Sequence, residues 1–477
     1  MKLSFHGAAK TVTGSKHLIT LRNGTKILLD CGLFQGLGRE TIALNKQWGF
    51  EPSEIDYVIL SHAHIDHVGL LPKLRKDGFD GQVFCTPQTA ELAFLLMRDS
   101  AHIQEMEATL INRTRQAKNK SAISPLYTDY DVQELIPMFK TVTYEEPYSI
   151  DGHIAFQFTE AGHILGSASV HLTITEEDEQ TTIAFSGDIG RYNDMILRSP
   201  ATFPKADYVI MESTYGNNLH DVLHPATDKI LNFINKTCIE KGGKLIIPAF
   251  SVGRTQEILY LLNRLETENR LPKTKYYVDS PLSMEATAIM KAHPECFNDQ
   301  VQQLLQKDDD VFAFEGLHYI ESVEESISLS TSNEPCVIIS ASGMAESGRV
   351  KHHIAQNISS DTNSILLVGY CEASSLGGQL HNGAKNVQIF GDSYEVRASV
   401  YEIDSMSAHG DYDDLCRWIS CQDNEKVKAV FLVHGEGDTQ LAFKDRLLRK
   451  GFANVQIPEL HETFPVGTKE LASNTVA

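Results

Sequence analysis

The stretch Ser61-His62-Ala63-His64-Ile65-Asp66-His67-Val68-Gly69 places three imidazoles and a carboxylate within six residues. It follows an apolar run over residues 55–60, which is typical of a buried strand. Because side chains alternate between the two faces of an extended segment, His62 and His64 point the same way and can share one cation. Asp66 and His67 follow where the chain turns, so they point to a different centre. The spacing predicts two metal ions; the alternatives are a histidine-rich surface loop or single histidines buried with hydrogen-bond partners.

The bulk composition fits a globular protein of more than one domain. At 477 residues the chain exceeds one ordinary hydrophobic core, and its 42% hydrophobic and 22% charged residues are ordinary for a globular chain. The sequence has no run of about eighteen consecutive apolar residues, which argues against a membrane span. The first residues lack the apolar core of a signal peptide. We therefore expect a cytoplasmic protein without a membrane partner. Its eight cysteines form no Cys-x-x-Cys pair and are expected to be reduced.

The charge balance is strongly acidic. The chain carries 63 acidic and 42 basic residues, which gives a formal net charge of −21 at pH 7. Nucleic-acid phosphates are normally bound by lysine and arginine. This balance argues against tight non-specific binding, so a nucleic-acid substrate would need a narrow basic channel or a partner.

Short strands that end in polar residues are predicted along the first part of the chain. A hairpin is expected over residues 17–30 around Asn23-Gly24, and Asp30 ends its second strand. Residues 89–115 have apolar side chains at helical spacing, which predicts one long helix or two broken ones with a basic, solvated tail. Later strands release polar side chains that can gather on one rim of a sheet: His163, Asp188 and Glu212.

The pattern of the sequence changes near residue 217. From there strands alternate with helices, which predicts a parallel α/β sheet. The tail returns to histidines at strand ends, His409 and His434. We therefore expect a first domain over residues 1–216, an inserted domain over residues 217–395 and the rest of the first domain over residues 396–477.

These motifs resemble the metallo-β-lactamase superfamily. The resemblance rests on His62-Ala63-His64-Ile65-Asp66-His67 together with His163, Asp188 and His434. Glu212 in Glu-Ser-Thr-Tyr-Gly, His409 in Ser-Ala-His-Gly-Asp and residues 248–254 and 340–344 are similar to motifs of its β-CASP branch. The resemblance is closest to RNA-processing nucleases of the kind of the cleavage and polyadenylation endonuclease. It implies an α/β fold, a metallo-β-lactamase αββα sandwich with an inserted parallel-sheet β-CASP domain.

The resemblance also implies a ligand set for two zinc ions per chain. One ion is expected on His62, His64 and His163, the other on Asp66, His67 and His434, with Asp188 bridging both. Zinc is the first choice for these ligand types, although manganese binds similar mixed sites. Asp30 is expected to orient a metal-bound histidine from behind.

The reaction implied by the resemblance is hydrolysis of phosphodiester bonds within single-stranded RNA. A hydroxide held between the metals would attack phosphorus, and His409 would give a proton to the leaving oxygen. Glu212 would hold the His409 ring, and the expected catalytic set is Asp66, Glu212 and His409. Taken alone, Asp188 or Glu212 could merely cap a loop, and His409 could be a packing histidine.

Contacts to substrate phosphates are expected from the inserted domain. Hydroxyls, backbone amides of glycine turns and a guanidinium all suit a phosphate. The candidates are Arg254, Ser340, Ser342, Gly343 and Arg349. They could equally stabilise a domain joint or, for Arg254, form a surface ion pair.

Two other functions stay open on the sequence alone. The acidic surface would suit a hydrolase of a small phosphodiester or ester, since a fold does not fix its substrate. A non-catalytic scaffold is the third reading, but every expected ligand position holds a residue that can bind metal. The sequence also leaves a homodimer open.

Overall fold

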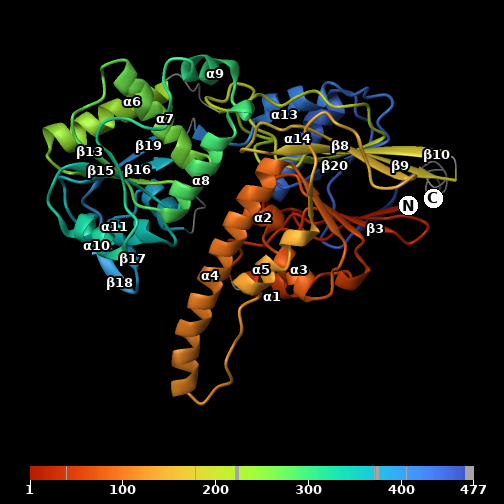
Figure 1. Ribbon diagram of the computed structural model, residues 1–477, viewed down its shortest axis with the longest axis horizontal. Helices are drawn as coiled ribbons and strands as arrows, with labels where there is room; N and C mark the ends of the chain where they lie inside the picture. The colour runs from red at the N-terminus through yellow and green to blue at the C-terminus, as the bar shows by residue number, and fades with distance from the viewer. Residues whose placement is uncertain are drawn as a thin grey trace. The chain divides into compact units, whose positions relative to one another are not determined.

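The computed structural model describes residues 1–38, 40–177, 179–220, 225–369, 371, 375–403 and 406–467. The chain divides into two compact units (Figure 1). Unit 1 comprises Met1–Leu219 and His409–Ala477, and unit 2 comprises His220–Ala408. Unit 2 is therefore inserted in sequence between two parts of unit 1.

The first sheet of unit 1 has seven strands. Its N-terminal strands form an antiparallel meander, and the turn between the second and third places Gly24 at φ +95°, a conformation that favours glycine. The predicted hairpin is thus confirmed. In spatial order the strands are β22 (Thr463–Pro465), β1 (Lys2–Phe5), β2 (His17–Thr20), β3 (Lys26–Leu29), β4 (Tyr57–Ile59), β5 (Gln82–Cys85) and β6 (Phe139–Thr141).

The second sheet of unit 1 joins the two sequence-distant parts of the unit. The strand that precedes His434 pairs in parallel with the strand that ends at Glu212, over the whole length of both. In spatial order the strands are β21 (Val455–Gln456), β20 (Ala429–Val433), β11 (Tyr208–Glu212), β10 (Glu179–Phe185), β9 (Ala168–Glu176), β8 (Ile154–Glu160) and β7 (Tyr148–Ser149).

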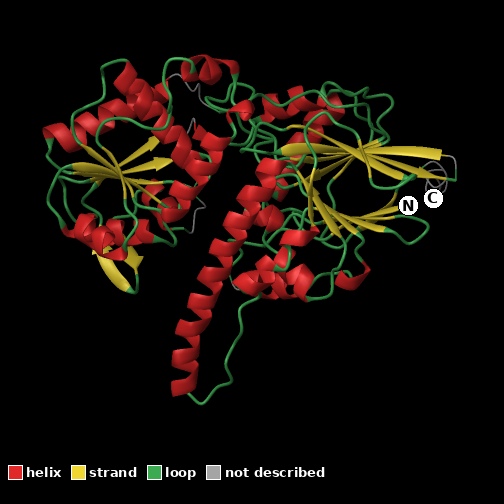
Figure 2. Cartoon of the chain, in the orientation of Figure 1, coloured by secondary structure: helices red, strands yellow, loops and turns green. Residues whose placement is uncertain are grey.

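The facing sides of the two sheets form one apolar core. The rings of Phe5 and Phe431 lie 5.2 Å apart between centroids, and those of Phe84 and Phe156 lie 5.3 Å apart. Helices cover the outer side of each sheet (Figure 2), which gives the expected αββα sandwich. They are α1 (Glu40–Lys46), α2 (Ile65–Val68), α3 (Leu71–Lys76), α4 (Pro87–Ala117), α5 (Asp129–Gln133), α13 (Tyr412–Ile419) and α14 (Gly437–Arg449), with short turns η1 (Pro52–Glu54) and η2 (Ile136–Met138).

Unit 2 is built on a six-stranded parallel sheet, as the alternating pattern predicted. Its strands in spatial order are β14 (Leu317–Tyr319), β13 (Lys275–Val278), β15 (Cys336–Ser340), β12 (Lys244–Pro248), β16 (Ser364–Val368) and β19 (Ser399–Ile403). A separate hairpin comprises β17 (Asn386–Ile389) and β18 (Asp392–Glu395). The helical segments are α6 (Pro225–Ile234), η3 (Asn235–Glu240), α7 (Arg254–Thr267), α8 (Pro281–Ala292), η4 (Pro294–Cys296), α9 (Asp299–Leu305), α10 (Val323–Thr331), α11 (Arg349–Asn357) and α12 (Leu376–His381).

Three details differ from or sharpen the expectations. The expected boundary at 395/396 lies before β19, but β19 pairs in parallel with β16, so unit 2 extends to Ala408. The segment expected as one helix or two is the single helix α4, which Thr86 caps by accepting a hydrogen bond from the Thr89 amide. Among the described helices, none combines the length and apolar character needed to cross a membrane.

Candidate metal centre

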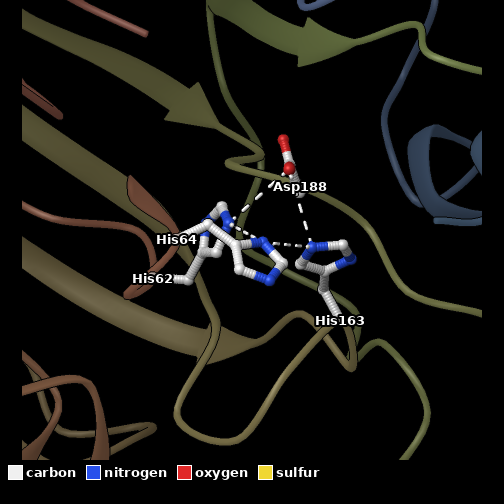
Figure 3. Close-up of side chains that lie close together, drawn as sticks. All are labelled: His62, His64, His163 and Asp188. Atoms are coloured by element: carbon white, nitrogen blue, oxygen red, sulfur yellow. Dashed lines mark hydrogen bonds and ion pairs between the residues drawn. The ribbon is translucent and has the colours of Figure 1, made fainter. Parts of the chain in front are cut away.

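Three imidazoles and one carboxylate lie close together in unit 1 and form a first group of possible metal ligands (Figure 3). They belong to His62, His64, His163 and Asp188. His64 Nδ1 lies 3.1 Å from both His62 Nε2 and His163 Nε2. Asp188 Oδ2 lies 3.5 Å from His62 Nε2 and 3.6 Å from His163 Nε2. All four side chains are buried except His64, which is partly exposed. Their ligand atoms lie within 4.8 Å of one another, a separation that one bound cation can bridge.

A second group adjoins the first through Asp188. His434 Nε2 lies 3.3 Å from both Asp66 Oδ2 and His67 Nε2. Asp188 Oδ2 lies 3.3 Å from His67 Nε2, so this one oxygen contacts both groups. The structure therefore brings together all seven side chains that the resemblance placed on metal.

Asp30 fixes the rings of two of these histidines. His67 Nδ1 donates to Asp30 Oδ2 at 2.7 Å, which turns His67 Nε2 toward the centre. Ser61 Oγ donates to the same carboxylate at 2.9 Å and lies 3.0 Å from His62 Nδ1. A single buried carboxylate thus orients His67 directly and His62 through a hydroxyl. Such partners set which ring nitrogen is free for a metal.

Sequence reasoning missed Ser61 and Thr214 as orienting residues. Thr214 Oγ1 lies 3.1 Å from His434 Nδ1 and also donates to the His434 carbonyl at 3.1 Å. Ser61 directly precedes His62, and Thr214 lies two residues after Glu212. Their proximity to proposed functional residues was the available signal, but neither side chain's hydrogen bond could be read from it.

The local fold explains why these side chains meet. Asp188 and His434 follow β10 and β20, which both pair in parallel with β11, so their carboxyl ends lie at one edge of the second sheet. His62 follows β4 of the first sheet, which packs face to face with the second. Gly32 lets the loop after β3 approach the ligand segment, because a Cβ there would lie 1.6 Å from the Asp66 carbonyl oxygen. The backbone of that loop also bonds the ligand segment, with Cys31 N donating to His67 O at 2.7 Å.

The electrostatics of the centre favour a cation. Asp30, Asp66 and Asp188 have no lysine or arginine partner among the described residues, and buried Asp188 Oδ1 accepts no hydrogen bond from them. Burial opposes ionisation, yet the surrounding imidazoles hold the pKa of Asp188 well below its usual value and that of Asp66 at about 2. Carboxylates and imidazole nitrogens converge without a lysine or arginine among the described residues, and this donor set fits divalent metal.

His409 and Glu212 form a separate pair beside the centre. His409 Nδ1 donates to Glu212 Oε1 at 3.2 Å, and the His409 and His163 ring centroids lie 4.6 Å apart. The Ile189 amide also donates to Glu212 Oε1, at 2.6 Å. Burial by itself would lower the pKa of His409, but the Glu212 carboxylate outweighs it and raises that pKa to about 9. The ring is therefore protonated at neutral pH.

The five residues expected to contact phosphates lie in unit 2, and most have internal partners. Arg349 donates to Asp279 Oδ1 at 2.7 Å and to the Glu321 carbonyl at 2.9 Å, while buried Ser340 donates to the Asp279 carbonyl at 2.8 Å. Arg254 is buried and pairs with Glu257.

The other two candidates lie in the loop before α11. Ser342 is partly exposed and donates to the Ser347 carbonyl at 3.3 Å. Gly343 packs under Phe250, where an added Cβ would lie 2.6 Å from the ring. Ser340, Arg254 and Arg349, which donates three hydrogen bonds, thus stabilise unit 2 itself. Ser342 instead has a partly exposed hydroxyl, and Gly343 has no side chain to keep a ligand from its backbone.

Comparison with known families agrees with the class of protein that the fold and the centre indicate. The fold and the centre define a metal-dependent hydrolase. Family models match the metallo-beta-lactamase superfamily over residues 14–232, the Beta-Casp domain over residues 255–380 and the Zn-dependent metallo-hydrolase RNA specificity domain over residues 393–458. The chain belongs to the metallo-β-lactamase superfamily, in its β-CASP branch.

Curated relatives match along most of the chain. Ribonuclease TTHA0252 of Thermus thermophilus is 33% identical over 98% of this chain and 100% of its own length. The RNase J-like protein of Methanocaldococcus jannaschii is 31% identical over 92% of this chain and 94% of its own length. Transcription termination factor FttA of Methanosarcina mazei is 32% identical over 90% of this chain, but only 66% of its own length is covered.

Proposed function

We propose that the protein is a zinc-dependent ribonuclease that cuts within single-stranded RNA in the cytoplasm. The observation that carries the proposal is the contact of one Asp188 oxygen with both ligand groups, 3.5 Å from His62 Nε2 and 3.3 Å from His67 Nε2. Two adjacent metal positions suit in-line displacement at a phosphodiester. The RNA specificity model and the names of the two ribonuclease relatives support RNA as the polymer.

The residues would divide as the two groups do. His62, His64 and His163 would hold one ion, Asp66, His67 and His434 the other, and Asp188 would contact both. Two ions held there would polarise a phosphoryl oxygen and lower the pKa of the attacking water. Zinc accepts this mixture of imidazole and carboxylate, and manganese is the main competitor.

His409 would supply the proton for the leaving oxygen. It is protonated at neutral pH because Glu212 faces its Nδ1, and Nε2–H would be the group that gives the proton. Glu212 would hold the ring and its charge rather than contact substrate. Its buried carboxylate is itself fixed by the Ile189 amide, so the ring orientation is set before substrate arrives.

In unit 2, Ser342 and Gly343 would be the residues that approach substrate phosphates. Arg254, Ser340 and Arg349 would act mainly by holding their surroundings, because their polar groups already have partners. We further infer that the nuclease domain consists of residues 1–216 and of the C-terminal part of the chain that follows unit 2. The β-CASP insertion lies between these two parts.

A time course on end-labelled single-stranded RNA and the matching DNA tests the proposal. The reactions are run with zinc, with manganese and with chelator. Internal fragments from RNA that vanish with chelator are the expected result. Release of mononucleotides from the 5′ end would replace endonucleolytic by exonucleolytic action, and cleavage of DNA at an equal rate would overturn the RNA assignment.

A hydrolase of small phosphodiesters remains the competing function. The net charge of −21 is the observation that favours it, because a polyanion is repelled by an acidic surface. Protein that holds two metals, cleaves a small phosphodiester and leaves both polymers intact would establish that alternative.

A further inference from the structure

Helix α4 extends from unit 1 as an arm. Its first turn is fixed beside the candidate metal centre, because Thr86 Oγ1 and Thr89 Oγ1 donate to the Gly166 carbonyl at 2.7 and 2.8 Å, three residues after His163. At 1.5 Å per residue, its 31 residues reach about 45 Å. In Figure 1 the outer half of α4 projects beyond the other elements of unit 1.

The segment that returns from α4 covers one face of this outer half. Asn112 exchanges two hydrogen bonds of 2.8 Å with the backbone of Ile123. Arg115 Nε donates to the Ser121 carbonyl at 2.6 Å. The segment therefore packs on the face that carries positions 112 and 115 and leaves the opposite face exposed.

The opposite face carries an apolar stripe. Ile103, Met106 and Leu110 are 39%, 57% and 65% exposed and follow the three-then-four spacing of a coiled-coil seam. Ile111 on the same helix and Ile123 on the return segment are also exposed, although Ile123 lies on the covered side with Asn112. Five of the 17 exposed large hydrophobic side chains of the described chain thus fall in this short segment. Single exposed apolar residues are ordinary, but a cluster marks an interaction surface.

Charges on the outer half of α4 and its return are separated along the helix. In the inner part, Glu107 is exposed near the stripe, whereas Glu105 lies one heptad before Asn112 on the covered side; residues 108–128 contain no acid. The cations of the outer part are Arg113, Arg115, Lys118 and Lys120. A second copy of the arm that lay antiparallel would place its basic end beside this acidic part. A parallel copy would set cations against cations.

We propose that the outer half of α4 is a self-association surface on which two copies of the chain pair antiparallel, with Leu110 near the two-fold axis. In a two-fold interface the same patch serves both partners. The stripe from 103 to 110 would be covered by its own copy, and Ala117 of each chain would face the Ile103 end. Because the proposed contact is confined to one face of two helices, we expect a weak dimer whose population rises with protein concentration.

RNA is the competing occupant of the arm. Four cations without a nearby acid would suit a phosphate backbone. Ile103, Met106 and Leu110 favour a protein partner instead, because they offer a phosphate nothing to bind. The inference does not depend on the proposed reaction, since association can be measured without RNA.

Sedimentation velocity of the full chain over a range of micromolar concentrations is the test. The wild type is expected to form dimers as concentration rises. Leu110→Glu places two carboxylates at the axis and is expected to weaken dimerisation by at least about tenfold. Ile42→Glu is the matched control, because Ile42 on α1 is also 65% exposed; its dimerisation should equal that of the wild type.

Charge reversal tests the antiparallel orientation. Arg113→Glu with Lys118→Glu should abolish dimers, and adding Glu107→Lys should restore them in part because attraction returns with the signs exchanged. Monomeric wild type at every concentration would overturn the proposal, as would dimers that Leu110→Glu leaves intact. If the wild type is monomeric and Arg113→Glu with Lys118→Glu weakens binding of a labelled single-stranded RNA, the arm binds RNA instead.

Discussion

The Asp30 carboxylate accepts a 2.7 Å hydrogen bond from His67 Nδ1 while it also accepts the Ser61 hydroxyl, which itself lies 3.0 Å from His62 Nδ1. One buried side chain therefore sets the orientation of a histidine in each ligand group. Asp30 contacts His67 at Nδ1 and not at Nε2, the nitrogen that faces the centre. Its effect on metal binding therefore acts through the orientation of the histidine rings.

Asp30→Asn is expected to weaken metal binding at both positions by roughly 10- to 100-fold, because an amide no longer favours Nδ1–H on His67. Competition with a fluorescent chelator measures the affinities. Ser61→Ala is the comparison, since it removes the hydroxyl between Asp30 and His62 but leaves the 2.7 Å hydrogen bond from His67 to Asp30. Equal losses from the two variants would contradict a direct role of Asp30 at His67.

His409→Ala is expected to lower kcat on RNA by about 10² to 10⁴ while leaving metal content unchanged, because the ring would move a proton without holding a metal. Single-turnover kinetics and metal analysis of the same preparation measure both quantities. His153→Ala, at an exposed histidine before β8, is the control. A variant that lost a metal ion along with its activity would show that His409 serves as a ligand.

Much of the centre could be predicted because its residues are close in sequence or end buried strands. The spacing of His62, His64, Asp66 and His67 indicated two groups, and the structure places them so. Asp188 and Glu212 were found because the apolar strand before each was evident.

The remainder depended on tertiary contacts. The Ser61 hydroxyl reaches Asp30 only after β3 and β4 pair, and no local pattern encodes that pairing. Likewise, the sequence of β19 did not reveal that it joins the sheet of unit 2 through β16. The periodicity of α4 predicted a helix but not that its outer half projects, since an apolar stripe at this spacing is equally typical of a helix packed on a core.

Gly32→Ala is expected to lower metal occupancy and stability together. The added Cβ would meet the Asp66 carbonyl oxygen at 1.6 Å, so the loop or the ligand segment must move. Metal analysis and thermal unfolding measure the two effects. Gly152→Ala is the control, because an added Cβ there meets no atom within 4 Å. Full occupancy in Gly32→Ala would mean that the ligand segment is positioned without this close approach.

Glu160, at the end of β8, predicts a pH dependence of stability. Burial raises its pKa to about 7, although the Gly162 amide at 3.0 Å and Arg198 oppose the shift. Between about pH 4.5 and pH 7 the folded state keeps a proton that the unfolded state loses. The free energy of unfolding therefore falls as pH rises through this window.

Glu160→Gln cannot ionise, so relative to this variant the wild type is expected to lose of the order of 2 kcal/mol between the two ends of that window. Chemical denaturation of both proteins at each pH gives the difference. Glu395→Gln, at an exposed carboxylate of β18, should track the wild type. A wild type that grew more stable than Glu160→Gln with rising pH would reverse the assigned direction of the shift.

Removal of metal is expected to lower the Tm, because a ligand that binds only the folded state stabilises it and because Asp30, Asp66 and Asp188 would then lie together without a cation. Asp188→Asn should lose metal from both positions, since its Oδ2 contacts His62 and His67 alike. Chelator should therefore lower the Tm of the wild type far more than that of Asp188→Asn. Calorimetry with and without chelator, beside metal analysis, measures this, and Asp392→Asn on the exposed hairpin of unit 2 serves as the control. If Asp188→Asn kept two metals and the full response to chelator, Asp188 would not link the two groups, and each would have to hold its ion independently.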